Sequence, residues 1–142
     1  DFTKRMRVRF QISRNTSVAA AIARMWISDT VPTAVLASRG FGIHIDNFTL
    51  QGASYESAQG LVDLSTTMVT SLSYLVEIFH EPGIPRMQWY VNGVLKGTST
   101  TAANIPTTQS GNCSFHAGII NGVTAADALF DFGNIFIWQE FP

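Results

Sequence analysis

The chain has 142 residues, of which 13% are charged, and a formal net charge of −1 at pH 7. A charge this close to zero supplies no general attraction to nucleic acid or acidic lipid, so we expect neither a nucleic-acid nor a membrane partner. The single cysteine, Cys113, excludes an intramolecular disulfide and zinc sites built on paired cysteines. No run of about 18 apolar residues occurs that could form a membrane-spanning helix. The length and the hydrophobic content of 46% predict one domain over 1–142 with a substantial core.

The first half of the chain consists mainly of runs in which apolar and polar residues alternate, the pattern of half-buried strands. In the run 5–13, apolar side chains share one face, and Arg5, Arg7 and Arg9 share the other. A turn is expected over 14–17. Further strands are expected from about 20 to 28, over 40–46 and over 48–55, with a loop over 29–32, a turn at Asn47 and a loop or short strand over 59–65.

The second half contains the strongest local signal, the stretch 85–100. Asn92-Gly93 lies between two apolar alternating runs and predicts a tight hairpin turn, because both residues tolerate a positive φ. Before the turn, one face carries Met, Trp and Val, which we expect against the core. The other face carries Gln88 and Tyr90, which we expect to point outward.

The remaining runs complete an all-β pattern. The run 70–81 is apolar on both faces, which predicts a central strand. The polar, β-branched segment 96–101 predicts an edge strand. Strands are also expected over 114–120 and 128–140, with turns over 81–85 and at 121–122, a bulge at Gly133 and no helix. Short strands with a turn every eight to twelve residues are typical of a sandwich, barrel or jelly roll.

Several of these segments also occur in a recognisable order. They are 4–10 (Lys-Arg-Met-Arg-Val-Arg-Phe), 22–29 (Ile-x-Arg-x-Trp-Ile-Ser-Asp), 40–46, 74–78, 89–95 (Trp-Tyr-Val-Asn-Gly-Val-Leu), 104–107 (Asn-Ile-Pro-Thr) and 130–140. Together they resemble the concanavalin A-like, laminin G-like jelly rolls common among bacteriophage virion and tail-associated proteins. The resemblance implies an all-β, two-sheet antiparallel jelly-roll sandwich whose first and last strands are adjacent. It leaves the function open, because this superfold hosts lectins, glycanases, adhesion modules and capsid decorations.

The sequence shows no catalytic or metal-ligating set. Glycoside hydrolysis needs two carboxyl groups about 5–9.5 Å apart, and no such acidic pair shares one face of an apolar strand core. Glu77 and Glu81 are four residues apart, but Glu81 falls in a Pro-Gly turn. His44, His80 and His116 lie in separate expected strands rather than on one helix, where a zinc motif would place them. We therefore predict a non-enzyme with no catalytic residue, no metal and no cofactor.

The outward-facing positions supply the candidate ligand- or partner-binding residues. They are Arg5, Arg7, Arg9, Trp26, His44, Asp46, Gln88, Tyr90 and Trp138. The arginines are either a solvated face, paired with Asp131 or Glu140 across the contact of the first and last strands, or a contact for an acidic partner. The outward aromatics and His44 have three interpretations: anchors of a protein interface, a platform for sugars, or side chains buried by other parts of the fold.

Two functions from different classes fit these features. The first is a non-enzymatic structural or adhesion module of a phage-like particle, a capsid decoration or tail-associated protein at the virion surface or outside the cell. It would bind neighbouring virion subunits and form a homo-oligomer. The alternative is a lectin-like carbohydrate-binding module, in which Trp26, His44, Asp46, Gln88 and Tyr90 form one face for a glycan. A glycan hydrolase is a third hypothesis.

Overall fold

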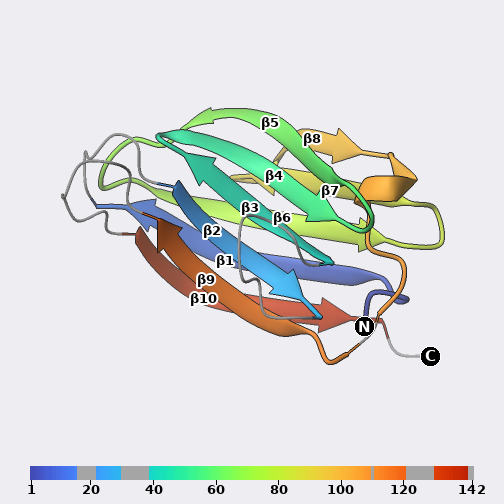
Figure 1. Ribbon diagram of the computed structural model, residues 1–142. Coiled ribbons are helices and arrows are strands. Elements are labelled where there is room, and N and C mark those ends of the chain that lie inside the picture. Colours follow the sequence, from blue (N-terminus) through green and yellow to red (C-terminus); the bar gives the residue numbers. More distant parts are fainter. Residues whose placement is uncertain (16–21, 30–38, 110, 121–129, 141–142) are drawn as a thin grey trace.

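The computed structural model describes residues 1–15, 22–29, 39–109, 111–120 and 130–140 (Figure 1). The strands are β1 (Met6–Arg14), β2 (Ile22–Ser28), β3 (Gly40–Asp46), β4 (Thr49–Tyr55), β5 (Gln59–Thr67), β6 (Ser73–Glu81), β7 (Arg86–Val91), β8 (Val94–Ser99), β9 (Ser114–Ile120) and β10 (Phe130–Gln139). The only helical element within the described residues is η1 (Ala102–Asn104), a single 3-10 turn. None of their helices is long and apolar enough to cross a membrane. The prediction of an all-β fold is confirmed.

The strands form two five-stranded antiparallel sheets that pack against each other (Figure 1). Sheet A has the order β10-β1-β6-β7-β8, and sheet B has the order β5-β4-β3-β2-β9. β1 pairs with β10 from Met6–Gln139 to Arg14–Phe130, so the first and last strands are adjacent, as the resemblance implied. β6 lies between β1 and β7, which confirms it as a central strand, and β8 forms an edge of sheet A.

Alternate side chains of both sheets fill the space between them. In the central hairpin, Met87, Trp89 and Val91 are at most 2% exposed, so the predicted inward face is confirmed. The indole of Trp89 ties the two sheets together, because its Nε1 donates a 3.0 Å hydrogen bond to the carbonyl oxygen of Gly42 in β3. The ring lies over Gly52 of β4, where an added Cβ would be 2.5 Å from Cε2 of the indole. The packing of the indole therefore requires a residue without a Cβ at position 52.

Positive φ angles mark the turns that the sequence predicted. Asn92 has a φ of 52° and Gly93 has a φ of 79°, which confirms the tight hairpin between β7 and β8. The Asn92 backbone N–H also donates to the Leu75 carbonyl at 2.8 Å, and Leu75 N–H donates to the Asn92 side-chain oxygen at 2.9 Å. Asn92 therefore also links the β7–β8 turn to β6 by two hydrogen bonds. Asn47, with a φ of 55°, forms the expected turn between β3 and β4.

A β-bulge lies in β10, close to its predicted position. The register between β1 and β10 shifts between Arg9 and Gln11. The residue with a positive φ is Asn134, at 51°, and its side-chain amide donates a 2.6 Å hydrogen bond to Gln11 Oε1. The extra residue is therefore Asn134, one position after Gly133. Asparagine is suited to this position, because its side chain can stabilise the left-handed conformation.

Three expectations differ from the structure. Residues 59–65 are part of a nine-residue strand, β5, rather than a loop or a short strand. Arg14 ends β1 instead of opening a turn, and its buried guanidinium stacks 3.7 Å from the ring centroid of Phe48. The strand expected from residue 70 begins later, because β6 starts at Ser73 and Leu72, which precedes it, is 53% exposed. The expected features over 16–21, 30–32, 121–122 and 128–129 lie outside the described residues.

Candidate functional site

The candidate residues lie on the outer faces of two different sheets. Trp26 belongs to β2, and His44 and Asp46 belong to β3, all in sheet B. Arg5 immediately precedes β1, and Arg7, Arg9, Gln88, Tyr90 and Trp138 lie in strands of sheet A. The prediction that Trp26, His44, Asp46, Gln88 and Tyr90 form one face is therefore wrong. Alternation along a strand gives the face of a side chain, but it does not give the sheet to which the strand belongs.

On sheet B, the predicted outward direction is right, but the main candidates are buried. Trp26 is only 2% exposed and packs against Ala53. His44 is 7% exposed, and its Nδ1 accepts a 3.1 Å hydrogen bond from Arg24 Nε. Burial lowers the pKa of His44, the Arg24 cation lowers it further, and Asp46 opposes both. Among the described residues of this face, a covered indole and a buried neutral imidazole leave little surface for a ligand.

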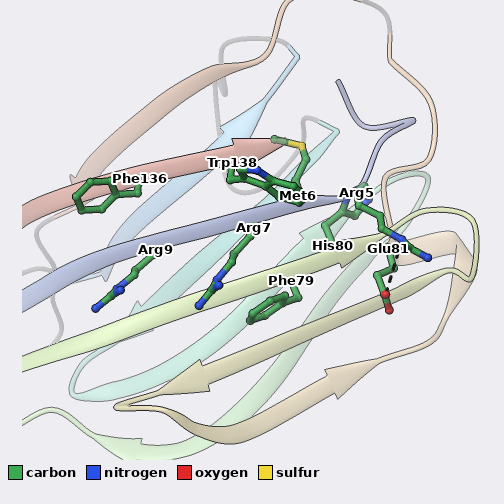
Figure 2. A pocket seen from close by; sticks show the side chains of 9 residues that line it. All are labelled: Arg5, Met6, Arg7, Arg9, Phe79, His80, Glu81, Phe136 and Trp138. Atoms are coloured by element: carbon green, nitrogen blue, oxygen red, sulfur yellow. Dashed lines mark ion pairs between the residues drawn. The ribbon is translucent and has the colours of Figure 1, made fainter. Parts of the chain in front are cut away.

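On sheet A, the outer face contains a hollow of about 540 Å³ (Figure 2). Its main lining residues come from three adjacent parts of the sheet: Arg5, Arg7 and Arg9 in or next to β1, Phe136 and Trp138 in β10, and Phe79 in β6. These residues are termed the arginine–aromatic face. The strand register explains the arrangement, since Trp138 lies opposite Arg7 and Phe136 lies opposite Arg9. Phe79 lies opposite Arg7 on the other side of β1.

The aromatic rings of this face are open to solvent to different degrees. Trp138 is 57% exposed and Phe136 is 64% exposed. Phe79 is half-buried, with the guanidinium of Arg7 4.9 Å from its centroid and the ring of Tyr90 at 5.3 Å in a T-shaped contact. Contiguous exposed aromatic side chains of this kind often mark a binding site in a soluble protein.

The arginines differ in how their charge is balanced. Arg7 Nη2 is 2.5 Å from Glu77 Oε1. Arg5 Nε is 4.0 Å from carboxylate oxygens of both Glu81 and Glu140, so the predicted pairing with Glu140 is confirmed for this residue. Arg9 is exposed and has no carboxylate partner within 4.0 Å among the described residues.

The predicted pairing of the arginines with Asp131 does not occur. Asp131 lies opposite Ser13 at the far end of the strand pair, and its carboxylate accepts a hydrogen bond from the side-chain amide of Asn15. Glu81 pairs mainly with Arg86, whose Nε donates a 2.6 Å hydrogen bond to the Glu81 carboxylate. The partners come mostly from β6, because β6 is the second neighbour of β1 and presents Glu77 and Glu81 on the same outer face.

The sequence alone did not identify Phe136 and Phe79 as site residues. Both could have been found from alternation, because Phe136 is two residues before Trp138, and Phe79 is two residues after Glu77. A polar cluster just beyond the ends of the sheet B strands was also unforeseen: Arg39 is 3.3 Å from Asp29 and 3.0 Å from Glu56. No group of three or more His, Cys, Asp or Glu side chains in the described part of the chain could hold a metal ion.

No family model matches the chain, and no curated protein sequence matches it. Solved structures do match. A β-glucanase from Bacillus licheniformis has a TM-score of 0.67 at 18% identity, over 97% of this chain and 67% of that chain. The binding domain of botulinum neurotoxin DC, in complex with SialylT, has a TM-score of 0.58 at 15% identity, over 96% and 32%. The alginate lyase AlgAT5 of polysaccharide lyase family 7 has a TM-score of 0.56 at 14% identity, over 98% and 61%.

These matches show the fold. The chain is an antiparallel, concanavalin A-like jelly-roll sandwich, as the resemblance implied. It spans about two thirds of the glucanase chain and about one third of the toxin domain. None of these matches is a phage protein, so the expected role in a phage-like particle stays a prediction.

Proposed function

We propose that this protein is a lectin-like carbohydrate-binding module and that the arginine–aromatic face of sheet A holds the glycan. The observation that carries the proposal is the hollow of about 540 Å³ in which Trp138 and Phe136 stand exposed beside arginine side chains. This volume is inside the range of roughly 300–1,000 Å³ found for ligand pockets. A pyranose ring has an apolar C–H face, which packs on an aromatic ring, and a rim of hydroxyl groups, which accept hydrogen bonds from guanidinium N–H groups.

The structural neighbours support a binding function. The toxin binding domain with the same fold was solved in complex with SialylT. The glucanase and the lyase show that the fold also occurs in enzymes, so catalysis has to be considered. We propose binding without catalysis, because Glu77 and Glu81, the carboxylates beside the hollow, are engaged by Arg7 and Arg86. Glycoside hydrolysis needs two carboxyl groups that are free to face the scissile bond, whereas these two are held in ion pairs.

The test is a glycan array followed by calorimetric titration of the best ligand. Trp138→Ala should weaken the affinity at least tenfold, because it removes the largest exposed ring of the face. Leu61→Ala is the matched control, since Leu61 is 44% exposed but lies on β5 of sheet B. Both variants should keep the wild-type circular dichroism spectrum. An array without binding, or equal affinity of Trp138→Ala and wild type, would contradict the proposal.

A module of a phage-like particle, acting through subunit contacts at a virion surface or outside the cell, is the second proposal. It is favoured by β10, the edge strand of sheet A, whose Ile135 and Ile137 are 41% and 49% exposed. Apolar edge strands of this length readily pair with another chain. A hollow of about 470 Å³ adjoins Ile137, between β10 and the start of β9.

Light scattering tests this second proposal. The wild type should form a homo-oligomer that sediments with the particle, and Ile137→Lys should dissociate it by placing a charge in the contact. Ile84→Lys is the control, because Ile84 is 64% exposed in the turn between β6 and β7, away from the edge. A wild type that stays monomeric at high concentration would count against subunit contacts.

A further inference from the structure

We infer that the glycan bound by the arginine–aromatic face carries carboxylate groups, as uronic and sialic acids do, and that Arg9 binds one of them. This inference rests on the proposed function and names the ligand class for the same site. It is carried by the distribution of charge around the hollow, by the position of Arg9 opposite an exposed ring, and by the carboxylates already present on the face.

Among the described residues, the ion-paired arginines and glutamates at the hollow leave one cation in excess. Most charged side chains there form ion pairs, namely Arg7 with Glu77, Arg86 with Glu81, and Arg5 with Glu140. Arg9 has no carboxylate partner within 4.0 Å in the described part of the chain, although the whole chain has a formal net charge of −1. An exposed cation without a partner, in a hollow lined by aromatic rings, selects a ligand with a negative group.

The position of Arg9 fits a sugar acid stacked on the ring of the neighbouring strand. In the β1–β10 register Arg9 lies opposite Phe136, so the two residues lie on the same outer face of neighbouring strands. Figure 2 shows Arg7 and Arg9 extending side by side from β1, with Phe136 and Trp138 on the neighbouring strand. Both arginine side chains extend from β1 toward β6, so a sugar stacked on Phe136 would have to reach across β1 to bring its acidic group to the guanidinium of Arg9. The planar N–H donors of arginine match a carboxylate in a bidentate hydrogen bond.

The same face disfavours a densely charged chain. On β6, Glu77 lies opposite Arg9, and Glu81 lies four residues further along the strand. A polysulfate would bring several negative charges near these carboxylates, and like charges at short distance repel. One free guanidinium among paired charges matches a ligand with one carboxylate on a sugar, which is the chemistry of a uronic or sialic acid.

The experiment compares ligands that differ only in the acidic group. The probes are sialyllactose against lactose, and trigalacturonate against its methyl ester, titrated by calorimetry at low and high salt. We expect at least one acid to bind about tenfold or more tightly than its neutral counterpart, with a preference that shrinks as salt screens the charge. Arg9→Gln should remove this preference. Lys96→Gln is the charge-matched control, because Lys96 is an exposed cation in β8 and outside the hollow, so the preference should remain.

The possible failures are distinguishable. Equal binding of acid and neutral sugars, lost in Trp138→Ala but unchanged in Arg9→Gln, would overturn this inference and leave the proposed function intact. Tighter binding of a sulfated oligosaccharide than of any carboxylated one, abolished in Arg9→Gln, would overturn the carboxylate assignment. If neither these probes nor a glycan array gave any binding, the proposed function itself would fall.

Discussion

The contact between Gly52 and Trp89 gives a sharp test of how the two sheets are held together. In Gly52→Ala, the new Cβ would lie 2.5 Å from Cε2 and 2.8 Å from Cγ of the indole. The indole has nowhere to move, because Trp89 is 0% exposed and its Nε1 is bonded to Gly42. Overpacking of a core costs about 1–3 kcal/mol, while replacing glycine gains roughly 0.4–1 kcal/mol through the unfolded chain.

We therefore expect Gly52→Ala to lower the free energy of unfolding by about 1–1.5 kcal/mol, which corresponds to a fall in Tm of roughly 3–5 °C. The assay is urea unfolding followed by tryptophan fluorescence and circular dichroism. Gly118→Ala is the matched control, because Gly118 also lies in a strand, β9, and a Cβ there would meet nothing within 4 Å. Its free energy of unfolding should stay the same or rise by up to about 1 kcal/mol, because the gain through the unfolded chain is not offset by a clash.

A double variant separates the clash from other effects of the alanine. Trp89→Phe removes the hydrogen bond to Gly42 and part of the ring that the new Cβ would strike. Gly52→Ala should therefore cost less in the Trp89→Phe background than in the wild type, with a coupling of about 1 kcal/mol. If Gly52→Ala were as stable as Gly118→Ala, or if the two effects were additive, the packing argument would be refuted.

Other predictions concern pH, the bulge and the surface ion pairs. Burial lowers the pKa of both His44 and His80, so these imidazoles stay neutral in the folded state while the unfolded chain binds protons. The free energy of unfolding should therefore fall as the pH drops below about 6.5, by at most about 1.4 kcal/mol per pH unit for each histidine. Urea unfolding at several pH values measures this dependence, which should be weaker in His80→Gln. Asn134→Ala should lower stability by about 1 kcal/mol because alanine tolerates a positive φ poorly, whereas Asn134→Gly should not, and thermal unfolding distinguishes them. Arg7→Gln should cost less than about 1 kcal/mol, and added salt should reduce the difference, because its pair with Glu77 is partly exposed.

Much of the fold could be predicted because its signals are local. The alternation around Trp89 and the positive φ tolerated by Asn92 and Gly93 identify the hairpin, and both depend only on near neighbours. The strand β5 was harder to identify, because its apolar residues do not alternate regularly and only Gly60 and Leu64 are fully buried in it. Its place in the sheet depends on pairing with β4, which its own composition does not reveal.

The candidate site could be predicted only in part, because a site depends on contacts between distant strands. The three arginines were assigned correctly to an outer face. The grouping of Trp26 with Tyr90 failed because nothing local states that β2 and β7 belong to different sheets. The burial of Trp26 and His44 also could not be foreseen, since exposure on an outer face depends on what covers that face.

The bulge at Asn134 has a consequence for the aromatic face. Phe130 and Phe132 lie on the inner side of β10, against the core, whereas Phe136 and Trp138 lie on the outer side, although all four positions are even-numbered. In an unbroken strand, residues of equal parity share one side. One extra residue therefore inverts the second half of the strand, so that its aromatic rings leave the interior and face the solvent. Without it, Phe136 and Trp138 would point toward the core, and the isoleucines at 135 and 137 would take their place beside the arginines.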